Sequence, residues 1–191
     1  MRDRHHLVSA RGLALAVTLA GISACLPGCG GWRGHGDTYY AHWTRRSKVN
    51  HEATYSFAHP PASEWRPAKE KGAQVLWVHR SLPALIHLGS QCEMHGDSSL
   101  ESFTDHLRID FREWKILSQE ATTMAGRDAV RTVVLAEIDG EVQTKLDLVV
   151  FKKNGCLFDL QYMASPSAFE RGRPAFNQVI AGFKFPVGGA E

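Results

Sequence analysis

The chain lacks the short motifs that would indicate a particular reaction. Its 191 residues contain neither the Gly-x-Ser-x-Gly turn of serine hydrolases nor the His-Glu-x-x-His helix of zinc proteases. The spacings Cys-x-x-Cys and His-x-x-x-His, which often supply the ligands of a closed metal site, are missing as well. We therefore expect a protein that is not an enzyme and carries no cofactor.

An excess of one charge is also missing. The chain has 22 Lys and Arg against 20 Asp and Glu, and its formal net charge of +2 comes from the first 24 residues, which hold three Arg and one Asp. The remaining chain is neutral, whereas domains that bind nucleic acid are usually basic. Nucleic acid is therefore not an expected partner.

No apolar run is long enough to span a bilayer. Residues 12–24 form an uncharged apolar stretch, shorter than the roughly 20 residues that a membrane-spanning helix needs. Arg2, Arg4 and Arg11 lie before or at the start of this stretch, and a basic segment followed by a short apolar one is typical of a secretory signal peptide. We expect this segment to be removed from the mature protein.

The residues that end this stretch resemble the lipobox of bacterial lipoproteins. The sequence Ile-Ser-Ala leads directly into Cys25, and the resemblance implies a diacylglycerol thioether on that sulfur and cleavage just before it. Two or three acyl chains would then hold the protein on a lipid bilayer. Cys29 is the alternative site, although a proline lies two residues before it, and a secreted protein without lipid is a third possibility.

The destination membrane follows from the residue after the anchor. Leu26 follows Cys25 and Gly30 follows Cys29, and neither is the Asp that retains many Gram-negative lipoproteins in the inner membrane. We expect the periplasmic side of the cell envelope, and the outer membrane rather than the inner one.

Cysteine is scarce, because the chain has only four. In an oxidising compartment we expect Cys92 and Cys156, at the ends of two predicted strands, to form a structural disulfide; the alternative is two buried free thiols. The cysteine count favours Cys29 as the anchor. In that case Cys25 would leave with the signal peptide, and Cys92 and Cys156 would remain as the only pair of unmodified cysteines. With Cys25 as the anchor, Cys29 stays as an odd thiol beside the membrane.

A metal site is the less favoured hypothesis for the same region. Cys92, His95 and Asp97 fall within six residues, and His106 follows. Zinc or copper accepts such ligands, and the set would be Cys92, His95 and His106. We expect no metal, because a disulfide would consume the sulfur of Cys92.

The chain divides into four segments. Residues 1–24 are the expected signal peptide, and residues 25–51 are a flexible, Gly-rich and basic tether. Residues 52–186 are expected to form a single α+β domain, and residues 187–191 a tail.

Hydrophobic patterning predicts the elements of the domain. Strands are expected from residue 53, over 74–79 and over 85–92, and a capping box of Ser98 and Glu101 is expected to start a helix. Four strands follow from Trp114 in an antiparallel meander with a hairpin at Asp139 and Gly140. Turns or solvent-facing positions are expected for five carboxylates: Asp110, Asp128, Asp139, Asp147 and Asp159.

A terminal helix is predicted by the spacing of Phe176, Val179, Ile180 and Phe183. Pro174 is expected in the first turn of that helix. A separate short helical turn is expected to carry Phe169. Strands followed by helices predict an antiparallel sheet of six or seven strands covered by helices.

The closing segment NGCLFDLQYMASPSAFERGRPAFNQVIAGFKF resembles the PsbP/Mog1-like superfamily, which includes DUF1795-type bacterial lipoproteins. Two further features support the resemblance: the opening segment YSFAHPP with Trp65 after it, and the central GRDA turn. The resemblance implies an α/β/α sandwich and an accessory role in binding or stabilising partner proteins. We expect an anchored, non-catalytic module for an envelope or transport partner of unknown identity. The alternative is a periplasmic protein that binds a small ligand or metal.

Overall fold

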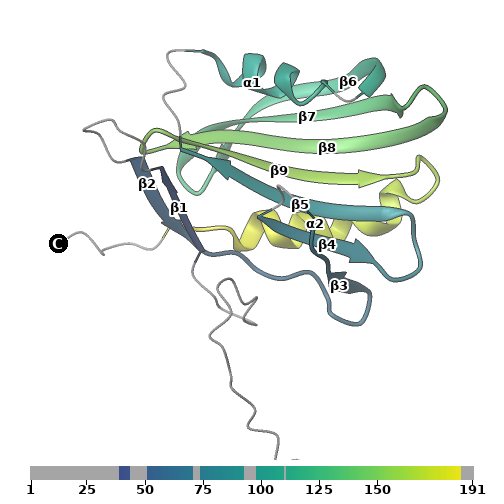
Figure 1. Ribbon diagram of the computed structural model, residues 1–191, viewed down its shortest axis with the longest axis horizontal. Coiled ribbons are helices and arrows are strands. Elements are labelled where there is room, and N and C mark those ends of the chain that lie inside the picture. The colour runs from purple at the N-terminus through teal and green to yellow at the C-terminus, as the bar shows by residue number, and fades with distance from the viewer. Residues whose placement is uncertain (1–38, 44–50, 71–73, 93–97, 110, 186–191) are drawn as a thin grey trace, which may run out of the picture. The chain divides into compact units, whose positions relative to one another are not determined.

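The computed structural model describes residues 39–43, 51–70, 74–92, 98–109 and 111–185 (Figure 1). Both candidate lipidation sites, the expected signal peptide and His95 lie outside the described residues. The elements, in chain order, are β1 (Tyr39–Trp43), β2 (His51–Tyr55), β3 (Trp65–Pro67), β4 (Val75–His79), β5 (Ala84–Gln91), α1 (Leu100–His106), β6 (Phe111–Met124), β7 (Arg127–Ile138), β8 (Val142–Lys153), β9 (Cys156–Ala164) and α2 (Phe169–Gly182). Strand β1 lies inside the range expected to be tether.

The main sheet has seven antiparallel strands in the order β3-β4-β5-β9-β8-β7-β6, and β1 pairs with β2 in a separate two-stranded sheet. Strands β6 to β9 form the expected meander. Asp139 and Gly140 both have positive φ, at 54° and 74°, as a tight hairpin requires. The last strand, β9, does not stay at the edge but pairs with β5 on its other side.

The two helices cover opposite faces of this sheet, because successive strand residues point to opposite sides. Tyr162 of β9 stacks on Phe176 of α2, with ring centroids 5.9 Å apart. Leu157, on the other face of β9, packs with Phe103 of α1. The expected α+β class, with an antiparallel sheet covered by helices, is therefore confirmed (Figure 1). Neither helix has the length and apolar content needed to cross a membrane.

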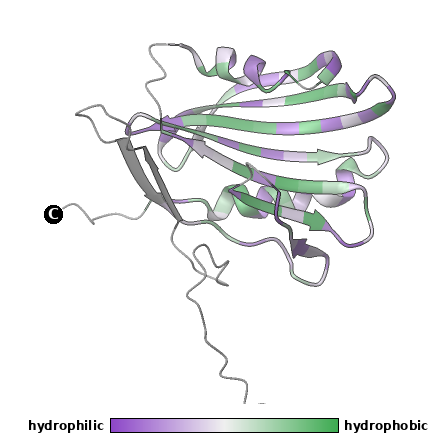
Figure 2. Cartoon of the chain, viewed as in Figure 1, coloured by the Kyte–Doolittle hydropathy of each residue, from purple (hydrophilic) through white to green (hydrophobic). Residues whose placement is uncertain are grey.

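Hydrophobic residues run along the middle strands of the sheet (Figure 2). At one end they form an aromatic cluster in which Tyr55 lies 5.3 Å from Phe158 and 5.4 Å from Phe183, measured between ring centroids. Beside this cluster, Ser56 and Lys184 exchange two backbone hydrogen bonds of 2.9 Å. The chain therefore enters and leaves the domain at the same end of the sheet.

Helix α1 begins one residue later than the predicted capping box. Its N-cap is Ser99, whose side chain accepts a hydrogen bond of 3.2 Å from the backbone N–H of Ser102, so the predicted cap at Ser98 is wrong. Hydrogen bonds from its own backbone N–H and from Ser99 lower the pKa of Glu101. Only Phe103 and Thr104 of this helix are buried. The helix is short because only about one turn of it packs against the sheet.

Helix α2 is continuous, so the separate helical turn expected around Phe169 is wrong, and Pro174 lies inside the helix rather than in its first turn. Gly172 lies inside this helix and gives room to Tyr162. A Cβ on Gly172 would lie 2.5 Å from the Tyr162 hydroxyl. That hydroxyl donates a hydrogen bond of 2.8 Å to the carbonyl oxygen of Phe169, and burial raises the pKa of Tyr162 to about 12.

Asp147 corrects a further expectation, because it is completely buried and not on a solvent-facing side of β8. Arg131 donates to its two carboxylate oxygens at 2.8 and 2.6 Å, and Arg173 of α2 donates at 2.9 Å. The hydrogen bond to Asp147 is the largest cause of the raised pKa of Arg131. Alternation predicts a solvent face only where one side of a sheet is open, and here α2 covers it.

Replacing Asp147 with Ala should lower the free energy of unfolding by about 2–4 kcal/mol, because two partly buried guanidinium groups lose their shared carboxylate. Denaturant unfolding measures the difference. Asp128→Ala is the matched control, since Asp128 is an exposed carboxylate near the start of β7. An equal decrease in the free energy of unfolding for the two variants would contradict the role assigned to Asp147.

Candidate functional site

A disulfide joins Cys92, just after β5, to Cys156, the first residue of β9. Both residues are buried, with 4% and 0% of their surface exposed. The bridge continues the pairing of β5 with β9, in which Gln91 faces Leu157. Because neither sulfur is accessible, the arrangement has the character of a structural bridge and not of a reactive thiol pair.

The structure does not bring the three residues of the metal hypothesis together as free ligands. The disulfide holds the sulfur of Cys92, and His95 lies outside the described residues. The ring of His106 packs edge-on against Phe103, with centroids 6.0 Å apart. Among the described residues, no group of three or more His, Cys, Asp or Glu is placed to hold a metal ion.

A polar cluster instead forms on the α1 side of the sheet, where β5 and β9 pair. His87 Nδ1 lies 3.7 Å from Asp159 Oδ1, and each side chain is about a fifth exposed, at 22% and 23%. Gln161 Nε2 donates a hydrogen bond of 3.2 Å to the same carboxylate oxygen. Asp159, expected in a turn or on a solvent face, is thus half-buried within a strand.

Gly89 makes this arrangement possible. It faces Asp159 across the two strands, and a Cβ at Gly89 would lie 2.5 Å from Asp159 Oδ1. Any side chain there would push the carboxylate out of its position beside His87. The glycine therefore serves a close approach between strands rather than a turn.

The electrostatics of the cluster favour a neutral imidazole. Burial lowers the pKa of His87, and the charge of Asp159 opposes this effect only in part. Among the described residues, His87 and Asp159 are paired only with each other and with Gln161. The cluster can exchange hydrogen bonds with a ligand, but it contains no hydroxyl or thiol nucleophile of the kind that a catalytic triad needs.

An apolar groove of about 240 Å³ adjoins the polar cluster on the same face. Leu85 lies two residues before His87 on β5, and Met163 lies two residues after Gln161 on β9. The full lining is Val78, Pro83, Ala84, Leu85, Ile138, Val142, Gln143, Thr144, Met163, Ala164 and Ser165. Polar and apolar features thus meet where β5 and β9 run side by side.

Sequence reasoning missed this site for a specific reason. His87 and Asp159 are separated by a helix and three strands, and only the register of β5 against β9 makes them neighbours. The one local signal was the pair of polar residues Asp159 and Gln161 alternating with apolar residues on β9.

Comparison with known proteins supports the fold. No protein-family model and no curated protein matches the sequence. LpqN of Mycobacterium tuberculosis, described as involved in cell envelope biogenesis, matches 78% of this chain and 92% of its own, with a TM-score of 0.52 and 15% identity. At that identity the similarity shows a shared fold alone.

CyanoP, the cyanobacterial PsbP of Synechocystis, matches 83% of this chain and 99% of its own with a TM-score of 0.46 and 13% identity. A Pseudomonas aeruginosa protein of unknown function matches 80% of this chain and 99% of its own, with a TM-score of 0.44 and 12% identity. Both TM-scores lie below 0.5.

Acid should destabilise the protein through His87. Its folded-state pKa lies below the unfolded value of about 6.5, so the unfolded chain binds the proton more readily as the pH falls. We expect the free energy of unfolding to fall as the pH drops below about 6.5, and His87→Gln to reduce that fall. Denaturant titrations at a series of pH values measure the free energy of unfolding, with His106→Gln as the control. If both variants keep the full pH dependence, the assignment to His87 is wrong.

Removing the bridge should cost stability without changing the fold. For a loop of 64 residues, chain entropy gives about 4 kcal/mol for the double variant Cys92→Ala, Cys156→Ala. Thermal unfolding of the wild type with and without reductant provides a second measurement. A melting temperature that does not respond to reductant or to the double substitution would show that the cysteines are not bonded.

Proposed function

We propose that this chain is a lipid-anchored, extracytoplasmic binding module that performs no chemistry itself. The observation that carries the proposal is the buried Cys92–Cys156 bridge, because structural disulfides persist in oxidising compartments outside the cytoplasm. The lipobox-like sequence before Cys25 supplies the anchor, with Cys29 as the alternative. The periplasmic side of the outer membrane is the proposed location.

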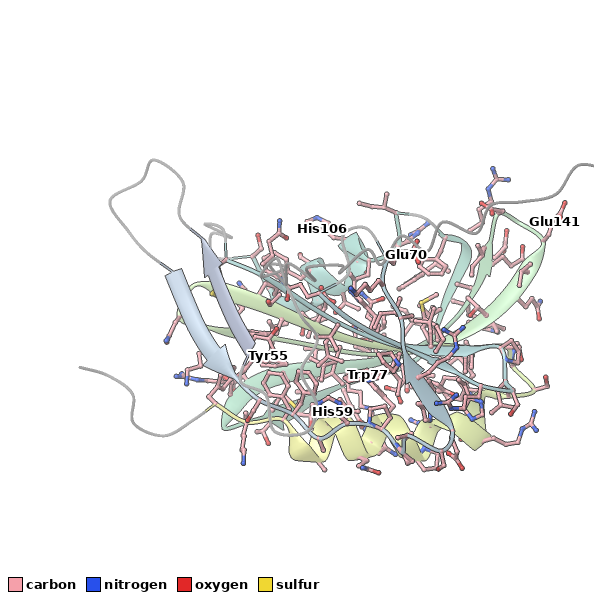
Figure 3. All side chains as sticks on the ribbon, turned by 60° about the horizontal axis from the view of Figure 1, so that its bottom comes forward. Tyr55, His59, Glu70, Trp77, His106 and Glu141 are labelled. Atoms are coloured by element: carbon pink, nitrogen blue, oxygen red, sulfur yellow. A yellow bond between two sulfur atoms is a disulfide. The ribbon has the colours of Figure 1, made fainter. Side chains whose placement is uncertain are left out.

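The geometry of the domain suits a tethered module. Tyr55, the last residue of β2, lies at the end of the sheet that holds Phe158 and Ser90. Its ring is 5.3 Å from that of Phe158, and its hydroxyl and that of Ser90 both donate to Gln74 Oε1. The groove lies at the opposite end, near Ala84 and Ala164. Strand β5 runs between the two ends with 8 residues, which corresponds to roughly 25 Å. Figure 3 shows Tyr55 and Glu141 at these two ends.

A module anchored through its N-terminus would therefore present the groove away from the bilayer that holds it. The proposed partner is a protein of the envelope or of a transport system, and the role is to bind or stabilise it. The description of LpqN as a protein of cell envelope biogenesis agrees with this role. Because a shared fold does not determine function, the proposal depends on the bridge and the anchor.

Binding of a small ligand is the second candidate function, favoured by the position of the groove next to His87 and Asp159. Ligand sites combine apolar walls with a few polar groups. The groove, at about 240 Å³, is smaller than the roughly 300–1,000 Å³ of typical ligand pockets. Any such ligand would be small.

The anchor is tested in a Gram-negative host that expresses the full chain. We expect the protein in the membrane fraction, labelled by radioactive palmitate, with an N-terminal peptide that begins at Cys25 and carries diacylglycerol. Cys25→Ala should abolish labelling and leave the signal peptide attached, whereas Cys29→Ala should leave both unchanged. The reverse pattern would move the anchor to Cys29. A salt-extractable protein that takes up no palmitate would refute the anchored module.

A further inference from the structure

The apolar groove has an acidic rim. Ile138 and Val142 line the groove, and the turn between them carries Asp139 and Glu141, both exposed. Val142 itself is 60% exposed, so its apolar side chain is accessible at the edge of the groove. The apolar surface and the two carboxylates thus belong to one β7–β8 turn.

The rim carboxylates have no ion-pair partner among the described residues. One cation lies beside the turn: the side chain of Arg112 is 3.4 Å from the position that a Cβ on Gly140 would take. It offsets part of the charge without bonding to Asp139 or Glu141. Arg80, in the β4–β5 connection, is not among the residues that line the groove, and its Nε donates a hydrogen bond of 3.3 Å to the carbonyl oxygen of Ala62. The rim is therefore negative overall.

These features select one kind of occupant. A groove of about 240 Å³ has room for one large apolar side chain and not for a helix or a sheet edge. A negative rim repels the phosphate of an anionic phospholipid and attracts Lys or Arg. The position far from Tyr55 also points away from the anchoring bilayer.

We propose that the groove binds a segment of a partner protein in which a large apolar side chain is flanked by Lys or Arg. The apolar side chain lies against Leu85, Val142 and Met163, and the basic groups face Asp139 and Glu141. This assignment rests on the proposed binding function and specifies the chemistry of its partner.

Peptide titration tests the assignment on the chain from residue 25 onward, with Cys25 and Cys29 replaced by Ser so that no lipid is attached. The probes are a short synthetic peptide with one leucine between lysines, the same peptide with glutamates for lysines, and a third with alanine for leucine. We expect only the first to shift the NMR methyl signals of Leu85, Val142 and Met163. Added salt should weaken its binding.

Two variants separate the charge from the apolar wall. Asp139→Asn with Glu141→Gln removes the rim charge, and Asn accepts the positive φ of position 139. We expect about tenfold weaker binding and the loss of most of the salt dependence. Val142→Ser should weaken binding by a similar factor while salt dependence remains. Asp128→Asn neutralises a carboxylate at the other end of the sheet and should change nothing. Thermal unfolding checks that each variant is folded.

Several outcomes would overturn the assignment. These are equal binding of the lysine and glutamate peptides, no shift with any peptide, or shifts produced by vesicles of phosphatidylglycerol. Signals that move with protein concentration alone would instead identify a second copy of this chain as the occupant. Palmitate labelling and membrane fractionation test the lipid anchor, whereas peptide titration tests binding in the groove. The two proposals can therefore fail independently.

Discussion

The pairing of β9 with β5 is the constraint on which the rest of the structure depends. It inserts the last strand into the middle of the sheet and sets one register over eight residue pairs, from Ala84 with Ala164 to Gln91 with Leu157. The bridge of Cys92 with Cys156 continues that register at one end. The approach of His87 to Asp159 and the groove floor of Leu85 and Met163 follow from it along the strands.

Burial on both faces is the second consequence. With α1 on one side and α2 on the other, β8 has no exposed face over its centre, and Leu148, Val149 and Val150 in succession are buried. A charged residue in such a strand needs partners, and Asp147 has two arginines from β7 and α2. That ion cluster also fixes α2 across the strands, because Arg173 belongs to the helix.

The two ends of the sheet differ in how their side chains are packed. At one end the aromatic cluster around Tyr55 and the backbone pairing of Ser56 with Lys184 hold the beginning and the end of the domain together. The other end is left to the β4–β5 connection and the β7–β8 turn, where apolar side chains remain partly exposed around the groove. The two ends are separated by the length of strand β5, which has 8 residues.

The sequence by itself determined the elements that depend on local patterning. Alternation along β8 and β9, the Asp139-Gly140 turn and the apolar spacing of α2 depend only on neighbouring residues, and the α+β class followed from them. The predicted cap of α1 and the predicted place of Pro174 in the first turn of α2 were wrong. The packing of Phe103 on the sheet and the fit of Gly172 against Tyr162 are tertiary contacts that local patterning does not show. Only tertiary structure decided that Asp147 is buried and that His87 meets Asp159. Both facts arise from strands and helices far apart in the chain, whose register and packing no local pattern encodes.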